Sequence, residues 1–131
     1  MEKNTNEDKN NKERKKEKNI KEIILESSAK EYFNSAEEDL QKARYNSAVV
    51  LYFKSLIALT DLFIFQKIKK TPSSHNERFS ITKTIFPEIY SLIDKNFPFY
   101  QDSYIQLMSK ELAEVIKNDA KIMAKKTEIE L

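Results

Sequence analysis

The feature that most constrains the fold is a mostly apolar stretch of 18 residues at positions 48–65, AVVLYFKSLIALTDLFIF. It contains two charged residues, Lys54 and Asp61, and Ser47 lies seven positions before Lys54. At 3.6 residues per turn, positions seven apart lie on one stripe of a helix. A membrane-spanning helix rarely keeps two charges near its middle. The stretch therefore predicts a central helix buried around most of its circumference, with one thin face toward water, and we expect no membrane partner and a cytoplasmic location.

The residues before this stretch also follow a helical period. From position 20 to 45 the apolar residues recur at the i, i+3, i+4, i+7 spacing of one helical face: Ile20, Ile23, Ile24, Ala29, Tyr32, Phe33, Ala36, Leu40 and Ala43. Ser27 and Ser28 are expected to bend or split this segment. Asn46 or Ser47 is expected to cap the central helix, which runs to about Lys70.

The second half of the chain is divided by prolines. Ser74 followed by Glu77 fits a capping box, which predicts a short helix over 75–84. A second short helix is expected to open at Pro87, and Pro98 is expected to open a last long helix over 98–126. The expected inner face of this last long helix consists of Tyr100, Tyr104, Leu107, Met108, Leu112, Val115, Ile116, Ala120 and Met123. No segment alternates like a strand, so the predicted fold is an all-α, up-and-down bundle of three long and about two short helices.

Residues 1–19 differ in composition from the rest. They carry seven basic and four acidic side chains and no aliphatic or aromatic one after Met1. Such a segment buries too little apolar area to offset its ordering entropy, so we expect a disordered, solubilising tail before a helical domain at 20–131. The alternative is that the basic residues at 12–18 form a nucleic-acid-binding arm or a nuclear address.

Composition excludes several kinds of chemistry. The chain has no glycine, which rules out the glycine-rich phosphate loops of nucleotide-binding enzymes. It has no cysteine and one histidine, so we expect no disulfide, no metal site and no cofactor. A di-metal carboxylate bundle would need Glu-x-x-His pairs, and the residue three before His75 is Pro72.

Two weak groups of candidate site residues remain. The first is His75 with Arg78 and Tyr104, because an imidazole near neutral pH can act as a general base. The second is an aromatic platform of Phe97, Phe99 and Tyr100, on which bases could stack. The alternative for each is structural: a surface histidine in a capping turn, and rings of the hydrophobic core.

Three pieces of the segment 36–119, one of them with a distinctive part, carry a family resemblance when taken in order. They are Ala36-x-x-Asp39-Leu40-x-x-Ala43, the stretch 47–62, its part Tyr52-Phe53-Lys54-Ser55-Leu56 with Leu59, and Pro72-Ser73-Ser74-His75. In this order and spacing the chain resembles the HEPN family (higher eukaryotes and prokaryotes nucleotide-binding). The resemblance implies a bundle of four or five helices, commonly a homodimer with a cleft between the protomers.

Many members of that family are ribonucleases, often toxins of toxin–antitoxin pairs with a small nucleotidyltransferase. Their mark is an Arg followed after four to six residues by His. Here the only arginines upstream of His75 are Arg14 and Arg44, neither at that spacing. We therefore expect a non-catalytic HEPN-like homodimer that binds a nucleotide, RNA or a protein. The alternatives are a metal-independent ribonuclease with a non-standard site and a partner module of a nucleotidyltransferase.

Overall fold

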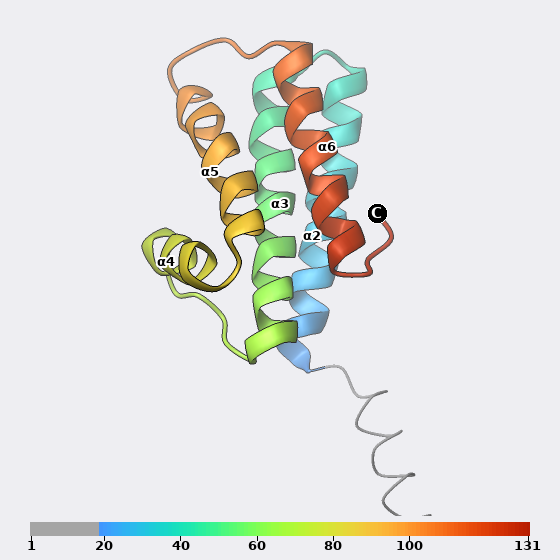
Figure 1. Cartoon of the computed structure of the whole chain (residues 1–131). Coiled ribbons are helices and arrows are strands. Elements are labelled where there is room, and N and C mark those ends of the chain that lie inside the picture. Colours follow the sequence, from blue (N-terminus) through green and yellow to red (C-terminus); the bar gives the residue numbers. More distant parts are fainter. Residues whose placement is uncertain (1–18) are drawn as a thin grey trace, which may run out of the picture.

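The structure is a computed structural model that describes residues 19–131 (Figure 1). These residues form five helices and no strand: α2 (Ile20–Gln41), α3 (Tyr45–Ile68), α4 (His75–Ile85), α5 (Pro87–Asp102) and α6 (Lys110–Lys126). The predicted all-α bundle is confirmed. The predicted tail lies outside the described residues except for Asn19, whose side chain accepts a hydrogen bond from the backbone N–H of Lys21 and caps α2.

The apolar helix α3 is the centre of the bundle. In Figure 1 it runs antiparallel to α2, with α6 and α5 packed against its other sides. It is long and apolar enough to span a membrane, but 72% of its most apolar 18-residue window is buried inside the protein, as in the core helix of a folded domain. Its large side chains Tyr52, Phe53, Leu56 and Leu59 are fully or almost fully buried. The predicted central helix is confirmed.

The predicted water-facing stripe of this helix is only partly correct. Ser47 and Lys54 are exposed, but Asp61 is only 9% exposed. Its carboxylate is paired with the guanidinium of Arg78 on α4. A sequence stripe shows which residues share a face, but it does not show that a later helix covers one end of that face.

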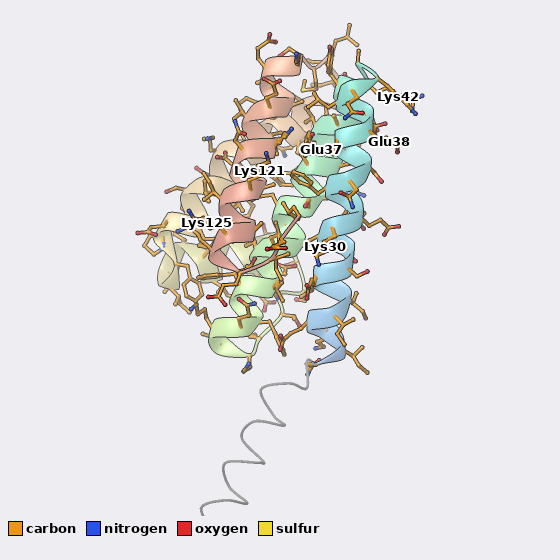
Figure 2. The ribbon with its side chains drawn as sticks, turned by 90° about the vertical axis from the view of Figure 1, so that its right-hand side faces the viewer. Lys30, Glu37, Glu38, Lys42, Lys121 and Lys125 are labelled. Carbon is orange, nitrogen blue, oxygen red and sulfur yellow. The ribbon has the colours of Figure 1, made fainter. Side chains whose placement is uncertain are left out.

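A polar contact joins α2, α3 and α6 on the side shown in Figure 2. The hydroxyl of buried Tyr52 donates to Glu37 Oε1 at 2.6 Å, and Lys117 Nζ lies 2.8 Å from the same oxygen. Burial alone would raise the pKa of Glu37, but the hydrogen bonds from Lys117 and Tyr52 lower it below its ordinary value. On the outer face of α2, Glu38 and Lys42 form an i,i+4 ion pair at 3.7 Å.

Several helix boundaries differ from their predictions. α2 continues unbroken through Ser27 and Ser28 and ends at Gln41. The N-cap of α3 is Arg44, without a side-chain cap, and neither Asn46 nor Ser47 fills that role. The cap of α4 is as predicted, because Ser74 Oγ accepts a hydrogen bond from the backbone N–H of Glu77 at 3.1 Å.

The prediction that Pro98 opens the last helix is wrong. Pro98 lies inside α5, which continues to Asp102, and α6 begins only at Lys110. A proline inside a helix leaves one carbonyl without its partner four residues later, here that of Asp94. Both Pro98 and Asp94 are exposed, so water can satisfy that carbonyl.

Two predicted apolar faces are also partly wrong. Tyr104 and Leu107 lie in the loop at 103–109, and both are exposed. Val115 is also exposed, whereas the buried residues of α6 include Ala113, Ile116, Ala120, Met123 and Ala124. At the start of α2, Ile20, Ile23 and Ile24 are exposed, and the first buried residue of this helix is Ala29.

Candidate functional site

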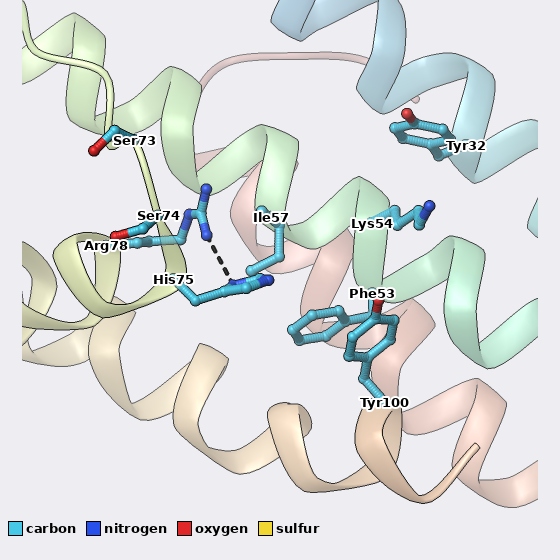
Figure 3. Close-up of a pocket in the computed structure, with 9 residues that line it drawn as sticks. All are labelled: Tyr32, Phe53, Lys54, Ile57, Ser73, Ser74, His75, Arg78 and Tyr100. Carbon is cyan, nitrogen blue, oxygen red and sulfur yellow. Dashed lines mark hydrogen bonds between the residues drawn. The ribbon is translucent and has the colours of Figure 1, made fainter. Parts of the chain in front are cut away.

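A pocket opens between α2, α3, α5 and the start of α4 (Figure 3). It has a volume of about 420 Å³, within the range of small-molecule sites. It is lined by Tyr32, Phe53, Lys54, Ile57, Ser73, Ser74, His75, Arg78 and Tyr100. We call it the His75 pocket. It lies over the face of α3 that carries the exposed Lys54, between α2 on one side and the start of α4 on the other.

The α4 side of the pocket is fixed by serine capping. Ser74 caps the helix, while Ser73 Oγ donates to Glu77 Oε2 at 2.7 Å. The carboxylate of Glu77 thus reaches back to the residue before the cap, and the hydrogen bonds from Ser73 lower its pKa. These contacts hold the turn that presents His75 at the first position of α4.

An ion pair beneath the pocket ties α4 to α3. Arg78 donates from Nε to Asp61 Oδ1 at 2.6 Å and from Nη2 to Asp61 Oδ2 at 2.8 Å. Both residues are buried, and the two parallel hydrogen bonds form the forked geometry of a strong arginine–carboxylate pair. The carboxylate therefore faces Arg78 rather than the pocket.

The guanidinium of Arg78 also determines which tautomer His75 adopts and, in addition to burial, lowers the pKa of its ring. Arg78 Nη1 lies 2.9 Å from His75 Nδ1 (dashed line in Figure 3). Because arginine can only donate, Nδ1 is the acceptor and the proton of the neutral ring is on Nε2. Partial burial and the positive charge of Arg78 lower the pKa of His75, against the opposing effect of Asp61. His75 is therefore a neutral hydrogen-bond donor through Nε2.

Aromatic rings form the other side of the pocket. Phe53 and Tyr100 are stacked with ring centroids 4.6 Å apart. Tyr100 shares a hydroxyl–hydroxyl hydrogen bond of 2.8 Å with Tyr104, and this bond, together with burial, raises the pKa of Tyr100. Lys54 Nζ lies 5.9 Å from the ring centroid of Tyr32, so an ammonium group stands at the rim opposite His75.

The structure brings some of the candidate residues together. His75 and Arg78 are in contact, and both line the pocket with Tyr100. Tyr104 does not line it and reaches it only through the hydroxyl of Tyr100. Phe97 packs behind His75, with ring centroids 5.5 Å apart, and Phe99 is a partly buried core residue outside the lining.

Other lining residues were missed by the sequence analysis. They are Tyr32, Phe53, Lys54, Ile57, Ser73 and Ser74. One signal could have found part of this set: Lys54 is a charge in an otherwise apolar helix, and its side chain is exposed at the pocket. The contribution of Tyr32 has no such signal, because it depends on how α2 lies against α3.

The charged groups that line the pocket are cationic, and two serine and two tyrosine side chains add hydroxyls. None of the described residues lining it is a carboxylate. Lys54 supplies an ammonium group and His75 an N–H donor, while the charge of Arg78 is paired with Asp61 beneath the pocket. Over the described range 19–131, no group of three or more His, Asp or Glu side chains is positioned to hold a metal ion. The pocket therefore has the chemistry of an anion site beside aromatic rings.

In comparisons with known proteins, no family model and no curated protein matches this chain. The HEPN resemblance stays a prediction, and the geometry of the His75 pocket is the basis for a functional proposal.

Proposed function

We propose that the protein is a HEPN-like helical binding protein that holds a nucleotide, or the end of an RNA chain, in the His75 pocket without cleaving it. The observation that carries the proposal is that hydrogen-bond donors and aromatic rings lie side by side in one pocket. Lys54 offers positive charge and His75 offers the N–H group of Nε2, while the stacked rings of Phe53 and Tyr100 offer an aromatic surface. A nucleotide has both complementary parts, an anionic phosphate and a flat base.

The state of His75 favours binding over catalysis. A general base must present an unprotonated nitrogen to its substrate. Here Nδ1 is occupied by Arg78, and Nε2 carries the proton. The lowered pKa of His75 also disfavours the imidazolium that base catalysis would form. The alternative of a ribonuclease using His75, Arg78 and Tyr104 would require this arrangement to change.

Titration calorimetry of the full chain tests the proposal, with AMP, ATP and a short single-stranded RNA as ligands in buffer containing EDTA. We expect saturable binding that weakens by about tenfold in Lys54→Ala, because a charge-assisted contact contributes on the order of 1.5 kcal/mol. Lys125→Ala is the matched control, since Lys125 is exposed on α6 away from the pocket (Figure 2). Absence of binding by all three ligands, or equal weakening in both variants, would overturn the proposal.

Electrophoresis of the RNA from the same mixtures separates binding from cleavage. We expect intact RNA with the parent protein. Cleavage that disappears in His75→Ala would instead favour the ribonuclease alternative.

We propose that the binding protein is a homodimer, as the resemblance implies. The apolar stretch at 48–65 leaves little surface for a dimer interface, because α2, α5 and α6 cover most of that helix. Light scattering coupled to size exclusion measures the mass directly, and a monomer at all salt concentrations would remove the dimer. A module acting with a nucleotidyltransferase is the remaining alternative, and an isolated gene would count against it.

A further inference from the structure

Four isoleucines are exposed at the end of the bundle where α2 begins and α3 ends. Ile20, at 73%, is the most exposed, followed by Ile24 and Ile23 on the first turn of α2 and Ile68 on the last turn of α3. The two segments lie side by side, since Lys21 Nζ is 3.4 Å from Thr71 Oγ1. We call this surface the isoleucine–lysine end. Packing within the described bundle does not explain why isoleucine stands at these four positions, because all four side chains are exposed there.

The same surface is cationic. Lys21, Lys69 and Lys70 are exposed around the isoleucines. Lys70 Nζ lies 3.8 Å from Glu77 Oε1, and Lys69 Nζ lies 5.4 Å from the ring centroid of Phe65. Lys67 is also exposed, with its ammonium over the ring of Phe63, and Glu22 is the one acidic residue of 19–24 and 67–72.

Apolar groups surrounded by lysines restrict the partner. A second copy packed symmetrically on this end would bring its lysines against these lysines, and like charges repel. A nucleic acid would be attracted by the lysines, but its phosphates offer nothing to the isoleucines. The surface of an anionic lipid bilayer offers both acyl chains for apolar side chains and negative headgroups for basic ones.

We propose that the isoleucine–lysine end is a docking surface for an anionic lipid bilayer, with Ile20, Ile23 and Ile24 inserted among the headgroups and Lys21, Lys69 and Lys70 in contact with them. The sequence-based expectation of no membrane partner considered a spanning helix, whereas docking leaves α3 buried in the bundle. The surface does not include any residue of the His75 pocket, so the proposal is independent of the proposed function.

Vesicle co-sedimentation of the full chain tests this surface, with vesicles of phosphatidylcholine alone and of phosphatidylcholine with 30% phosphatidylglycerol. We expect binding to the anionic vesicles, weakened by salt, and a loss of at least about tenfold in the partition coefficient for Ile20→Ser/Ile23→Ser/Ile24→Ser. Circular dichroism of this variant should match the parent, because the three side chains are exposed.

A matched control comes from the opposite end of the bundle. Ile105 and Leu107 are 81% and 93% exposed in the 103–109 loop, so Ile105→Ser/Leu107→Ser removes apolar surface far from α2's first turn. The partition coefficient of this variant on anionic vesicles should equal that of the parent. The proposal is overturned if the parent does not bind anionic vesicles, or if the control loses binding as much as the triple variant. It is also overturned if an acidic peptide or RNA binds this end while vesicles do not.

Discussion

The guanidinium of Arg78 and the carboxylate of Asp61 form a two-bond ion pair, with N–O distances of 2.6 and 2.8 Å, in the interior between α4 and α3. The two residues are 17 positions apart in the sequence. The third donor of the same guanidinium holds His75, so one side chain links the core to the pocket.

Truncating one partner of this pair should strongly destabilise the protein. In Asp61→Ala, Arg78 keeps a buried charge without a counter-charge, which costs about 3–5 kcal/mol of unfolding free energy. Urea unfolding followed by circular dichroism measures the loss. Arg44→Gln is the control, because Arg44 is exposed and its contact to Asp39 is 3.6 Å, so the expected loss is below about 1 kcal/mol. Equal losses in the two variants would contradict the structural role given to Asp61.

The single histidine predicts a pH dependence of stability. The pKa of His75 lies below its ordinary value in the folded protein. As the pH falls, the unfolded chain therefore binds this proton before the folded protein does. The stabilisation is complete above the ordinary pKa of about 6.5 and is lost as the pH falls from there through the folded pKa.

Unfolding free energies of the parent and of His75→Gln, measured from pH 8 to pH 5, test this effect. We expect the parent to lose more stability than the variant over that interval. Proton NMR gives a second readout, since the chain has one imidazole to follow. An imidazole pKa at or above the ordinary value would show that Arg78 does not hold the ring as described.

Within the described residues of this glycine-free chain, three have a left-handed backbone: Ala43, Lys69 and Glu128, with φ of 57°, 57° and 60°. This conformation costs a residue with a Cβ about 1–2 kcal/mol relative to the right-handed one, and glycine avoids the clash. Ala43→Gly should therefore raise the unfolding free energy by about 0.5–1 kcal/mol, because part of the gain is offset by the added freedom of the unfolded chain. Thermal unfolding measures the change.

A glycine at an ordinary helical position serves as the control. Glu31 is exposed in the middle of α2, and Glu31→Gly should lower stability by about 1 kcal/mol. If both variants are destabilised, the left-handed geometry of Ala43 is not a source of strain.

Asn46 holds the loop at 103–109 with one side chain. Its Nδ2 donates to the carbonyls of Ser103 at 3.0 Å and Gln106 at 2.7 Å, and its Oδ1 accepts from the N–H of Met108 at 2.9 Å. In Asn46→Ala we expect faster amide exchange in this loop and a loss of about 1–3 kcal/mol, because backbone groups lose their partners. Hydrogen-exchange mass spectrometry localises the effect. Gln101→Ala, an exposed truncation on α5, should leave exchange in the loop unchanged.

The sequence predicts the fold better than it predicts the site. Helical periodicity identifies α2 and α3, and Ser74 identifies the start of α4, because these signals are local. The end of α5 was misplaced because it depends on Asn46, 57 residues from Ser103, and no local pattern carries that contact. A local signal for α6 does exist, since Ser109 caps it by accepting from the N–H of Leu112.

For the same reason, the sequence analysis identified only some of the residues of the pocket. His75 and Arg78 are three residues apart on one helix, so their contact is a consequence of helical spacing. Their relation to Asp61, Lys54 and Tyr100 depends on how α3 and α5 pack against α4. The sequence offers the side chains, and only the assembled bundle gives them a common pocket.

The three-residue connection between α2 and α3 bears on how the chain acquires its structure. Closing a short loop costs little entropy, and the two helices lie along each other over most of their length (Figure 1). Contacts between neighbours in sequence form sooner than those that must wait for a distant segment. We therefore expect the α2–α3 hairpin to be formed in the folding transition state, and α6 to pack against it only after that state. A substitution at the α2–α3 contact should then slow folding, whereas one on α6 should chiefly speed unfolding.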